Sequence, residues 1–161
     1  MSSLIDSRDV ALTGTASKEN LPVGTEVVKE AIESPFVNTI VESKKQNATK
    51  AVVEGGESDG KGTGTTIKYN PTYFADGPQG ILDENGKRGR LPYIGLAHEL
   101  IHTGPMNKGT VDSSPTNYKD PDTGVVGLID RDEFRTRQKD SMIRKEQNQP
   151  QRTVPSLSRK Y

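Results

Sequence analysis

The stretch Ala97-His98-Glu99-Leu100-Ile101-His102 contains the only two histidines of the chain, four positions apart. Side chains four residues apart lie on one face of a helix, one turn above each other, so both imidazoles can reach one metal ion. Glu99 lies roughly 100° further round the helix than His98, which is too far to bind the same ion comfortably but close enough to reach a water molecule that the ion holds. The pattern His-Glu-x-x-His therefore predicts a zinc site with its own general base.

The residues around this motif favour a buried helix. Pro92 suits a first helical turn, Tyr93–Thr103 contains no proline, and Gly104-Pro105 is expected to end the helix. Apolar residues occur both on the histidine side and on the opposite side: Ile94, Ile101, Leu96 and Leu100. A helix that is apolar nearly all round is buried, and buried imidazoles need partners that a metal ion supplies. The competing interpretation is a chance match of a short pattern, which is more typical of exposed helices.

Composition narrows the class of protein. The 161 residues include 22 Lys and Arg and 22 Asp and Glu, so the formal net charge is zero and neither nucleic acid nor membrane is expected as a partner. Hydrophobic residues make up only 30% of the chain, which predicts a small core that metal binding would stabilise. Cysteine is absent, which excludes disulfides, cysteine zinc ligands and thiol nucleophiles.

No apolar run reaches the roughly 18 residues of a membrane span, and the N-terminus lacks the pattern of a classical signal peptide. Export would then use another route, or a longer polypeptide. Residues 1–20 are polar and weakly patterned, and we expect them to form a flexible arm. Residues 21–161 are expected to form one domain.

Before the motif, the sequence predicts one helical region and two strands. Pro22–Lys45 has apolar residues at helical spacing on both sides of Pro35, which predicts two short helices or one kinked helix. Ala51–Glu54 is a candidate short strand, and Gly55–Gly64 lacks the hydroxyl residue of a phosphate-binding loop and suits a flexible hairpin turn. Thr65–Pro71 alternates as a strand does; it either pairs with a substrate backbone as an edge strand or lies within an ordinary sheet.

Around and after the motif, the pattern predicts fewer elements. Asp83–Gly86 is a strong turn signal. A long polar stretch and the apolar patch Val125–Ile129 lead to a charged helix that is expected to open at Asp130 and to run to about Gln147. From Pro150 onward we expect a tail.

Two histidines do not complete a catalytic zinc site, which takes a third protein ligand and leaves one position for water. Because the chain has no cysteine and no other histidine, that ligand must be Asp or Glu. Asp130–Glu133 opens the charged helix, and Glu133 is favoured because its neighbour Phe134 can pack in the core; Asp130 and Asp132 are the next candidates. The alternative is a solvated acidic first turn that complements the helix dipole.

Several blocks of the chain, in order, resemble the NleD-type zinc metallopeptidase effectors, which bacteria inject into other cells. Related peptidase domains form the tips of some Rhs-type and other polymorphic toxins. The similarity extends from Ile67 to Tyr161, and its most specific block is Leu96–His102. The other blocks are Ile67–Pro71, Asp132–Thr136 and Ser141–Glu146, followed by Pro150–Arg152.

The resemblance implies an α+β fold, a small zincin-like metallopeptidase domain with a short antiparallel sheet, an HExxH active-site helix and one Zn²⁺. In the family pattern His98, His102 and Glu133 hold the metal, and Glu99 is the catalytic base. The implied reaction is hydrolysis of a peptide bond in a protein of a target cell, by a zinc-bound water that Glu99 activates. The resemblance further implies a secreted effector or toxin, with a cognate inhibitor or a secretion-system carrier as additional partners, but it does not give the substrate.

Two other classes of function are compatible with the sequence. In one, the domain is a catalytically inactive zincin-like binding module whose zinc is structural, which a fourth protein ligand would favour. In the other, the chain is an interaction domain whose histidines are core residues, which a lack of zinc would favour. For an active peptidase, the candidate oxyanion donors are Arg135, Arg144, Arg152 and Tyr161.

Overall fold

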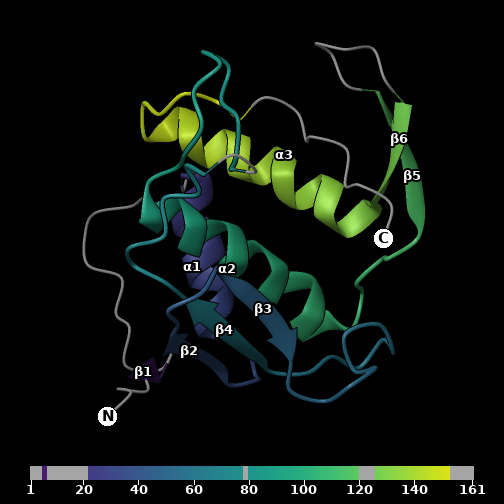
Figure 1. Ribbon diagram of the computed structural model, residues 1–161. Helices are drawn as coiled ribbons and strands as arrows, with labels where there is room; N and C mark the ends of the chain where they lie inside the picture. The colour runs from purple at the N-terminus through teal and green to yellow at the C-terminus, as the bar shows by residue number, and fades with distance from the viewer. Residues whose placement is uncertain (1–4, 7–21, 78–79, 120–125, 153–161) are drawn as a thin grey trace.

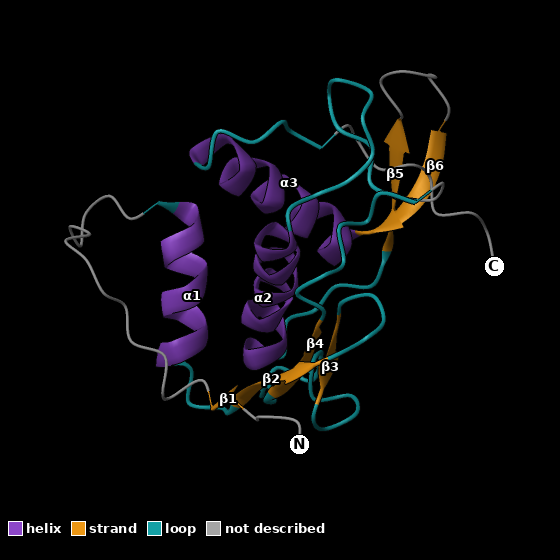
Figure 2. Ribbon diagram, turned by 60° about the vertical axis from the view of Figure 1, so that its left-hand side comes forward, coloured by secondary structure: helices purple, strands orange, loops and turns teal. Residues whose placement is uncertain are grey.

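The computed structural model describes residues 5–6, 22–77, 80–119 and 126–152, which form an α+β fold (Figure 1). The helices in this part of the chain are α1 (Val23–Glu33), α2 (Pro92–Lys108) and α3 (Arg131–Glu146). The strands are β1 (Ile5–Asp6), β2 (Asn38–Glu42), β3 (Ala48–Ala51), β4 (Thr65–Tyr69), β5 (Pro115–Lys119) and β6 (Val126–Asp130). The helices lie on one side of a four-stranded sheet, while β5 and β6 form a separate ribbon that leads into α3 (Figure 2). No helix among these residues is long and apolar enough to cross a membrane.

The four-stranded sheet is mixed, in the order β1-β2-β4-β3. The strands β2 and β4 run parallel with Ile40 opposite Ile67, whereas the other two pairs are antiparallel. The expectation of a short antiparallel sheet is therefore wrong at its centre. The strand at Thr65–Tyr69 is confirmed, but it is an interior strand rather than an edge strand, and the edge next to it is β3.

Helix α2 is longer than the sequence predicted, because Gly104-Pro105 does not end it. A proline normally forces the preceding residue out of the helical region by a clash with that residue's Cβ, and glycine has none. A Cβ at position 104 would also lie only 3.1 Å from a carboxylate oxygen of Glu30 on α1. The helix ends instead at Gly109, whose φ of 66° is the left-handed conformation that glycine adopts at helix ends.

The segment after Pro35 is a strand rather than the second half of a kinked helix. Its β-branched residues suit a strand that is paired along its length with β4. Asn38 begins this strand, is 1% exposed, and joins the neighbouring elements through its side chain, which donates to the carbonyl of Ala31 and accepts from the hydroxyl of Thr65. The short strand β3 lies ahead of the predicted Ala51–Glu54, and a hairpin connection links it to β4, as expected.

The chain after α3 returns to the body of the protein rather than leaving it as a tail at Pro150. Gln151 and Glu84 exchange backbone and side-chain hydrogen bonds of 2.9 Å. The backbones of Arg152 and Asp83 pair in an isolated antiparallel β-bridge. The predicted turn at Asp83–Gly86 is confirmed, and so is the charged helix α3. Residues 153–161 and most of the expected arm at residues 1–20 lie outside the described residues, although Ile5–Asp6 pairs with β2.

The three helices meet in a small apolar core of Val27, Ile94, Ile101 and Ile143. The N-terminus of α1 has no side-chain cap of its own. Glu146, at the end of α3, accepts the backbone N–H groups of Val23 and Gly24 instead. A carboxylate at a helix N-terminus satisfies orphan donors and complements the helix dipole, so this contact links the two helices.

We predict that Glu146→Ala lowers the free energy of unfolding by about 1 kcal/mol, the usual effect of losing a helix cap. Chemical denaturation of the purified protein measures it. Lys145→Ala is the control, because Lys145 is exposed on the same helix end. Equal stability of Glu146→Ala and Lys145→Ala would show that the contact is not a cap in solution.

Candidate metal centre

Helix α2 presents His98 and His102 on its face toward α3. The two residues are one turn apart, and their ring centroids are 5.2 Å from each other at an interplanar angle of 77°. His98 is 7% exposed, and His102 is partly buried. Imidazoles in such surroundings require polar partners, and α3 supplies them.

Glu133, in the first turn of α3, faces both rings. Its Oε2 lies 3.3 Å from Nε2 of His102 and 3.7 Å from Nε2 of His98. One ligand atom from each of the three residues lies within 4.8 Å of the others, which is close enough for one metal ion. The other oxygen of Glu133, Oε1, accepts a hydrogen bond from Arg137 Nε, which fixes the carboxylate.

The second nitrogen of each imidazole faces a different carboxylate of α3. Nδ1 of His102 lies 3.0 Å from Asp132 Oδ2 and 3.4 Å from the hydroxyl of Thr136. Nδ1 of His98 lies 3.7 Å from Asp140 Oδ2, and neither atom has a hydrogen bond within the described residues. Carboxylates on the outer nitrogen orient metal-binding histidines and make them more basic.

The sequence candidates therefore divide by position. Glu133 lies with both histidines, Asp132 contacts the outer nitrogen of His102, and Asp130 is exposed and is not brought to the cluster. Asp140 was not anticipated, although it continues the four-residue spacing of Asp132 and Thr136 along α3. That spacing places all three residues on one buried stripe of the helix. The same spacing in the sequence could have identified Asp140 as a candidate.

The acidic surroundings change the ionisation of the cluster. Burial alone would lower the pKa of His102, but its contacts with Asp132 and Glu133 outweigh burial and raise that pKa to about 9. Burial would raise the pKa of Glu133, and its contacts with both imidazoles lower it instead. The pKa of Asp140 is likewise lowered, because contact with His98 and the charge of Arg144 outweigh burial.

Glu99, the residue after His98, contacts the strand β3. Its Oε2 accepts a hydrogen bond of 2.9 Å from the hydroxyl of Thr49 in β3, and the same hydroxyl lies 3.0 Å from the backbone carbonyl of Glu99. Glu99 is 7% exposed, so this contact fixes a carboxylate with little access to solvent. No sequence pattern pointed to Thr49, because the contact joins residues fifty positions apart.

Arginines surround the acidic cluster. Arg144 is 2% exposed, and its Nε lies 3.3 Å from Asp140 Oδ1. Burial and the positive charge of Arg137 lower the pKa of Arg152 to about 10. Among the candidate oxyanion donors, Arg144 and Arg152 are thus near the cluster, Arg135 is exposed, and Tyr161 lies outside the described residues.

Two imidazoles and a carboxylate gathered between two helices of an α+β fold form a donor set that can hold one metal ion. The family model Peptidase_M91, described as "Effector protein", matches residues 13–154, and the chain belongs to this family. The match confirms the resemblance to NleD-type effectors and extends it upstream of Ile67. Searches of curated proteins and of solved structures found no match.

The raised pKa of His102 predicts that metal affinity depends on pH. A metal binds neutral imidazole, so at pH 7 it must displace a proton from His102, and the apparent affinity should rise between pH 7 and about 9. The free energy of unfolding of the metal-free protein changes in the opposite direction and falls with rising pH. The stability that protonated His102 provides is complete below pH 6.5 and is lost as the pH rises through about 9.

Zinc titration calorimetry in buffers of different ionisation enthalpy measures the released proton. Asp132→Asn is the informative variant, because losing that carboxylate should lower the pKa of His102 and shift the affinity profile to lower pH. An affinity that stays constant between pH 7 and 9 would contradict the prediction.

Proposed function

We propose that the chain is a zinc-dependent metalloendopeptidase of the HExxH zincin type, folded as one domain over residues 21–161. His98, His102 and Glu133 are the proposed zinc ligands, and Glu99 is the proposed catalytic base. The observation that carries the proposal is the convergence of two imidazole nitrogens and one carboxylate oxygen within 4.8 Å, one residue from a buried glutamate.

The donor set fits zinc. Two imidazoles and one carboxylate are a set found in catalytic zinc sites, and within the described residues the cluster contains three ligand residues rather than four. Three protein ligands leave a coordination position free for water or substrate. This arrangement favours a catalytic centre over the alternative of an inactive module with structural zinc.

The chemistry follows from the residues. Zinc, when bound here, supplies a Lewis acid that lowers the pKa of water toward 7 and polarises a carbonyl. Glu99 takes a proton from the attacking water and returns it to the leaving amine. Thr49 donates a hydrogen bond to the Glu99 carboxylate, Asp132 contacts the outer nitrogen of His102 at 3.0 Å, and Asp140 faces the outer nitrogen of His98 at 3.7 Å. Arg137 fixes Glu133 from its other side.

The substrate strand would lie along β3. Within the described residues β3 pairs on one side with β4 and is the edge of the sheet, and its residue Thr49 contacts Glu99. An extended peptide can add to such an edge through backbone hydrogen bonds. This position replaces the earlier candidate, the interior strand β4.

Membership of an effector family supports delivery into a target cell, where a host or competitor protein would be the substrate. Secretion by a route other than a classical signal peptide, and binding of a cognate inhibitor or a secretion-system carrier, belong to the same proposal.

We predict that Glu99→Gln retains zinc but loses peptide-bond cleavage by about 10²- to 10⁴-fold, because the amide cannot take up the proton. Zinc quantitation and a search for new N-termini in exposed cell lysate measure the two properties separately. Glu54→Gln, an equal change on the exposed hairpin, is the control. Cleavage at the wild-type rate by zinc-loaded Glu99→Gln would refute the role of Glu99.

We further predict that Thr49→Ala lowers kcat about tenfold with little change in KM or zinc content, because one hydrogen bond to the carboxylate of the base is lost. Thr49→Ser retains the hydroxyl and should restore most of the rate. Steady-state kinetics on a cleaved peptide provide the measurement. If the serine variant is as slow as the alanine variant, the hydroxyl does not position Glu99.

A further inference from the structure

A cationic cavity lies apart from the proposed metal ligands, none of which lines it. It has a volume of ≈ 310 Å³ and lies between the segment that precedes α2, the start of α2 and the end of α3. Its charged lining has four cationic side chains against two carboxylates: Lys87, Arg88, Arg90 and Arg144, with Asp76 and Asp83. The lining therefore has an excess of two positive charges.

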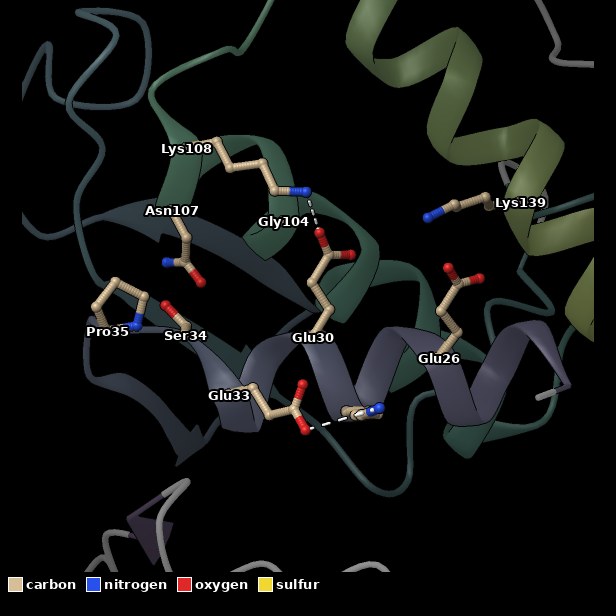
Figure 3. A pocket seen from close by; sticks show the side chains of 10 residues that line it. Glu26, Glu30, Glu33, Ser34, Pro35, Gly104, Asn107, Lys108 and Lys139 are labelled. Atoms are coloured by element: carbon tan, nitrogen blue, oxygen red, sulfur yellow. Dashed lines mark hydrogen bonds and ion pairs between the residues drawn. The ribbon is translucent and has the colours of Figure 1, made fainter. Parts of the chain in front are cut away.

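The larger cavity beside α1 offers a comparison (Figure 3). It has a volume of ≈ 660 Å³ and is lined by three glutamates and three lysines, so its formal charges balance. Two of the lysines are paired, Lys29 with Glu33 and Lys108 with Glu30. Nothing in that cavity requires a charged ligand.

Arg90 and Arg144 line the cavity, and each has a buried guanidinium nitrogen without a hydrogen-bond acceptor among the described residues: Nε of Arg90 and Nη2 of Arg144. Arg144 is 2% exposed, and its other nitrogens are used, Nε facing Asp140 and Nη1 donating to the carbonyl of Pro150 at 3.2 Å. A buried charged donor without an acceptor costs free energy, so a ligand that supplies the acceptor would be stabilising.

The surrounding residues hold these guanidinium groups in place. A Cβ at Gly95 would lie 3.1 Å from Nε of Arg90, so the absence of a side chain there lets the guanidinium lie against α2. Asp83, a buried acid in the cavity lining, is already used, because its Oδ1 accepts the backbone N–H groups of Asn85 and Lys87 at 2.9 Å. It therefore offers less to a neighbouring arginine.

We propose that this cavity binds an anionic oxygen group, a carboxylate or a phosphoryl, through Arg90 and Arg144. Guanidinium groups present their N–H donors in a planar fork that matches the oxygens of these anions. Phe74 and Ile94 also line the cavity and accommodate an apolar part of the ligand. The site goes beyond the proposed peptidase function and depends on neither zinc nor Glu99.

The site is connected to the metal centre by one chain of contacts. Arg144 faces Asp140 at 3.3 Å, and Asp140 faces the outer nitrogen of His98 at 3.7 Å. An anion bound to Arg144 would compete with Asp140 for the positive charge of the guanidinium group.

The experiment is a titration of the full chain with inorganic phosphate, followed through the arginine Nε–H signals in nuclear magnetic resonance spectra. It is done on metal-free and on zinc-loaded protein, because phosphate bound to zinc itself would disappear from the metal-free sample. We expect saturable shifts of the Arg90 signal in both forms. No saturable shift in the metal-free protein would overturn the proposal.

Matched variants separate a built site from general attraction. Arg90→Gln should weaken phosphate binding about tenfold or more, the usual effect of losing one charge-assisted hydrogen bond. Lys87→Gln removes the same charge from an exposed position of the same wall and should change binding by less than about threefold. Equal losses in the two variants would overturn the proposal. Should a variant of Arg144 not fold, this pair still provides the test.

Two further probes identify the source of the anion. These are N-acetylglutamate N-methylamide and its phosphoserine counterpart, with the glutamine amide as the neutral control. Tighter binding of either acidic peptide than of free phosphate supports a peptide ligand, and the reverse supports a small free anion. Binding of the glutamine amide as tight as that of the glutamate amide would contradict an anion site.

Discussion

The rest of the structure depends on one contact, in which carboxylates on α3 face two imidazoles on α2. Glu133 faces the inner nitrogens of His98 and His102, and Asp132 and Asp140 face the outer ones. The apolar core that joins the helices is small, so polar contacts and a bound cation would supply a substantial part of the stability. Removing one partner would leave buried charge unpaired, which is strongly destabilising.

The charges around this contact explain the arginines. Two of the three carboxylates in the cluster have a guanidinium partner, Arg137 with Glu133 and Arg144 with Asp140. The arginines therefore offset part of the negative charge, and the cluster remains a favourable site for a cation. Membership of an effector peptidase family agrees with such a centre. Glu99, on the same helix as the two histidines, contacts the edge strand β3.

The sequence predicted the features that are local in the chain. Periodicity identified the motif helix, the charged helix and the strand before the motif. Elimination left an acidic third ligand, and Glu133 was favoured over Asp130 and Asp132 because its neighbour Phe134 can pack in the core. Contacts between distant segments were not predicted. The apolar spacing of β2 suggested a helix, but pairing with β4 makes this segment a strand. Helix α2 continues past Pro105 because Gly104 removes the usual clash. Thr49 left no trace in the local pattern, whereas Asp140 could have been found from its four-residue spacing along α3.

The most direct test of the central claim is a crystal structure of the zinc-loaded protein with anomalous scattering measured at the zinc absorption edge. The account predicts one zinc peak at ~2.0–2.2 Å from Nε2 of His98, Nε2 of His102 and a carboxylate oxygen of Glu133. No peak between α2 and α3, or a zinc ion held without Glu133, would contradict it.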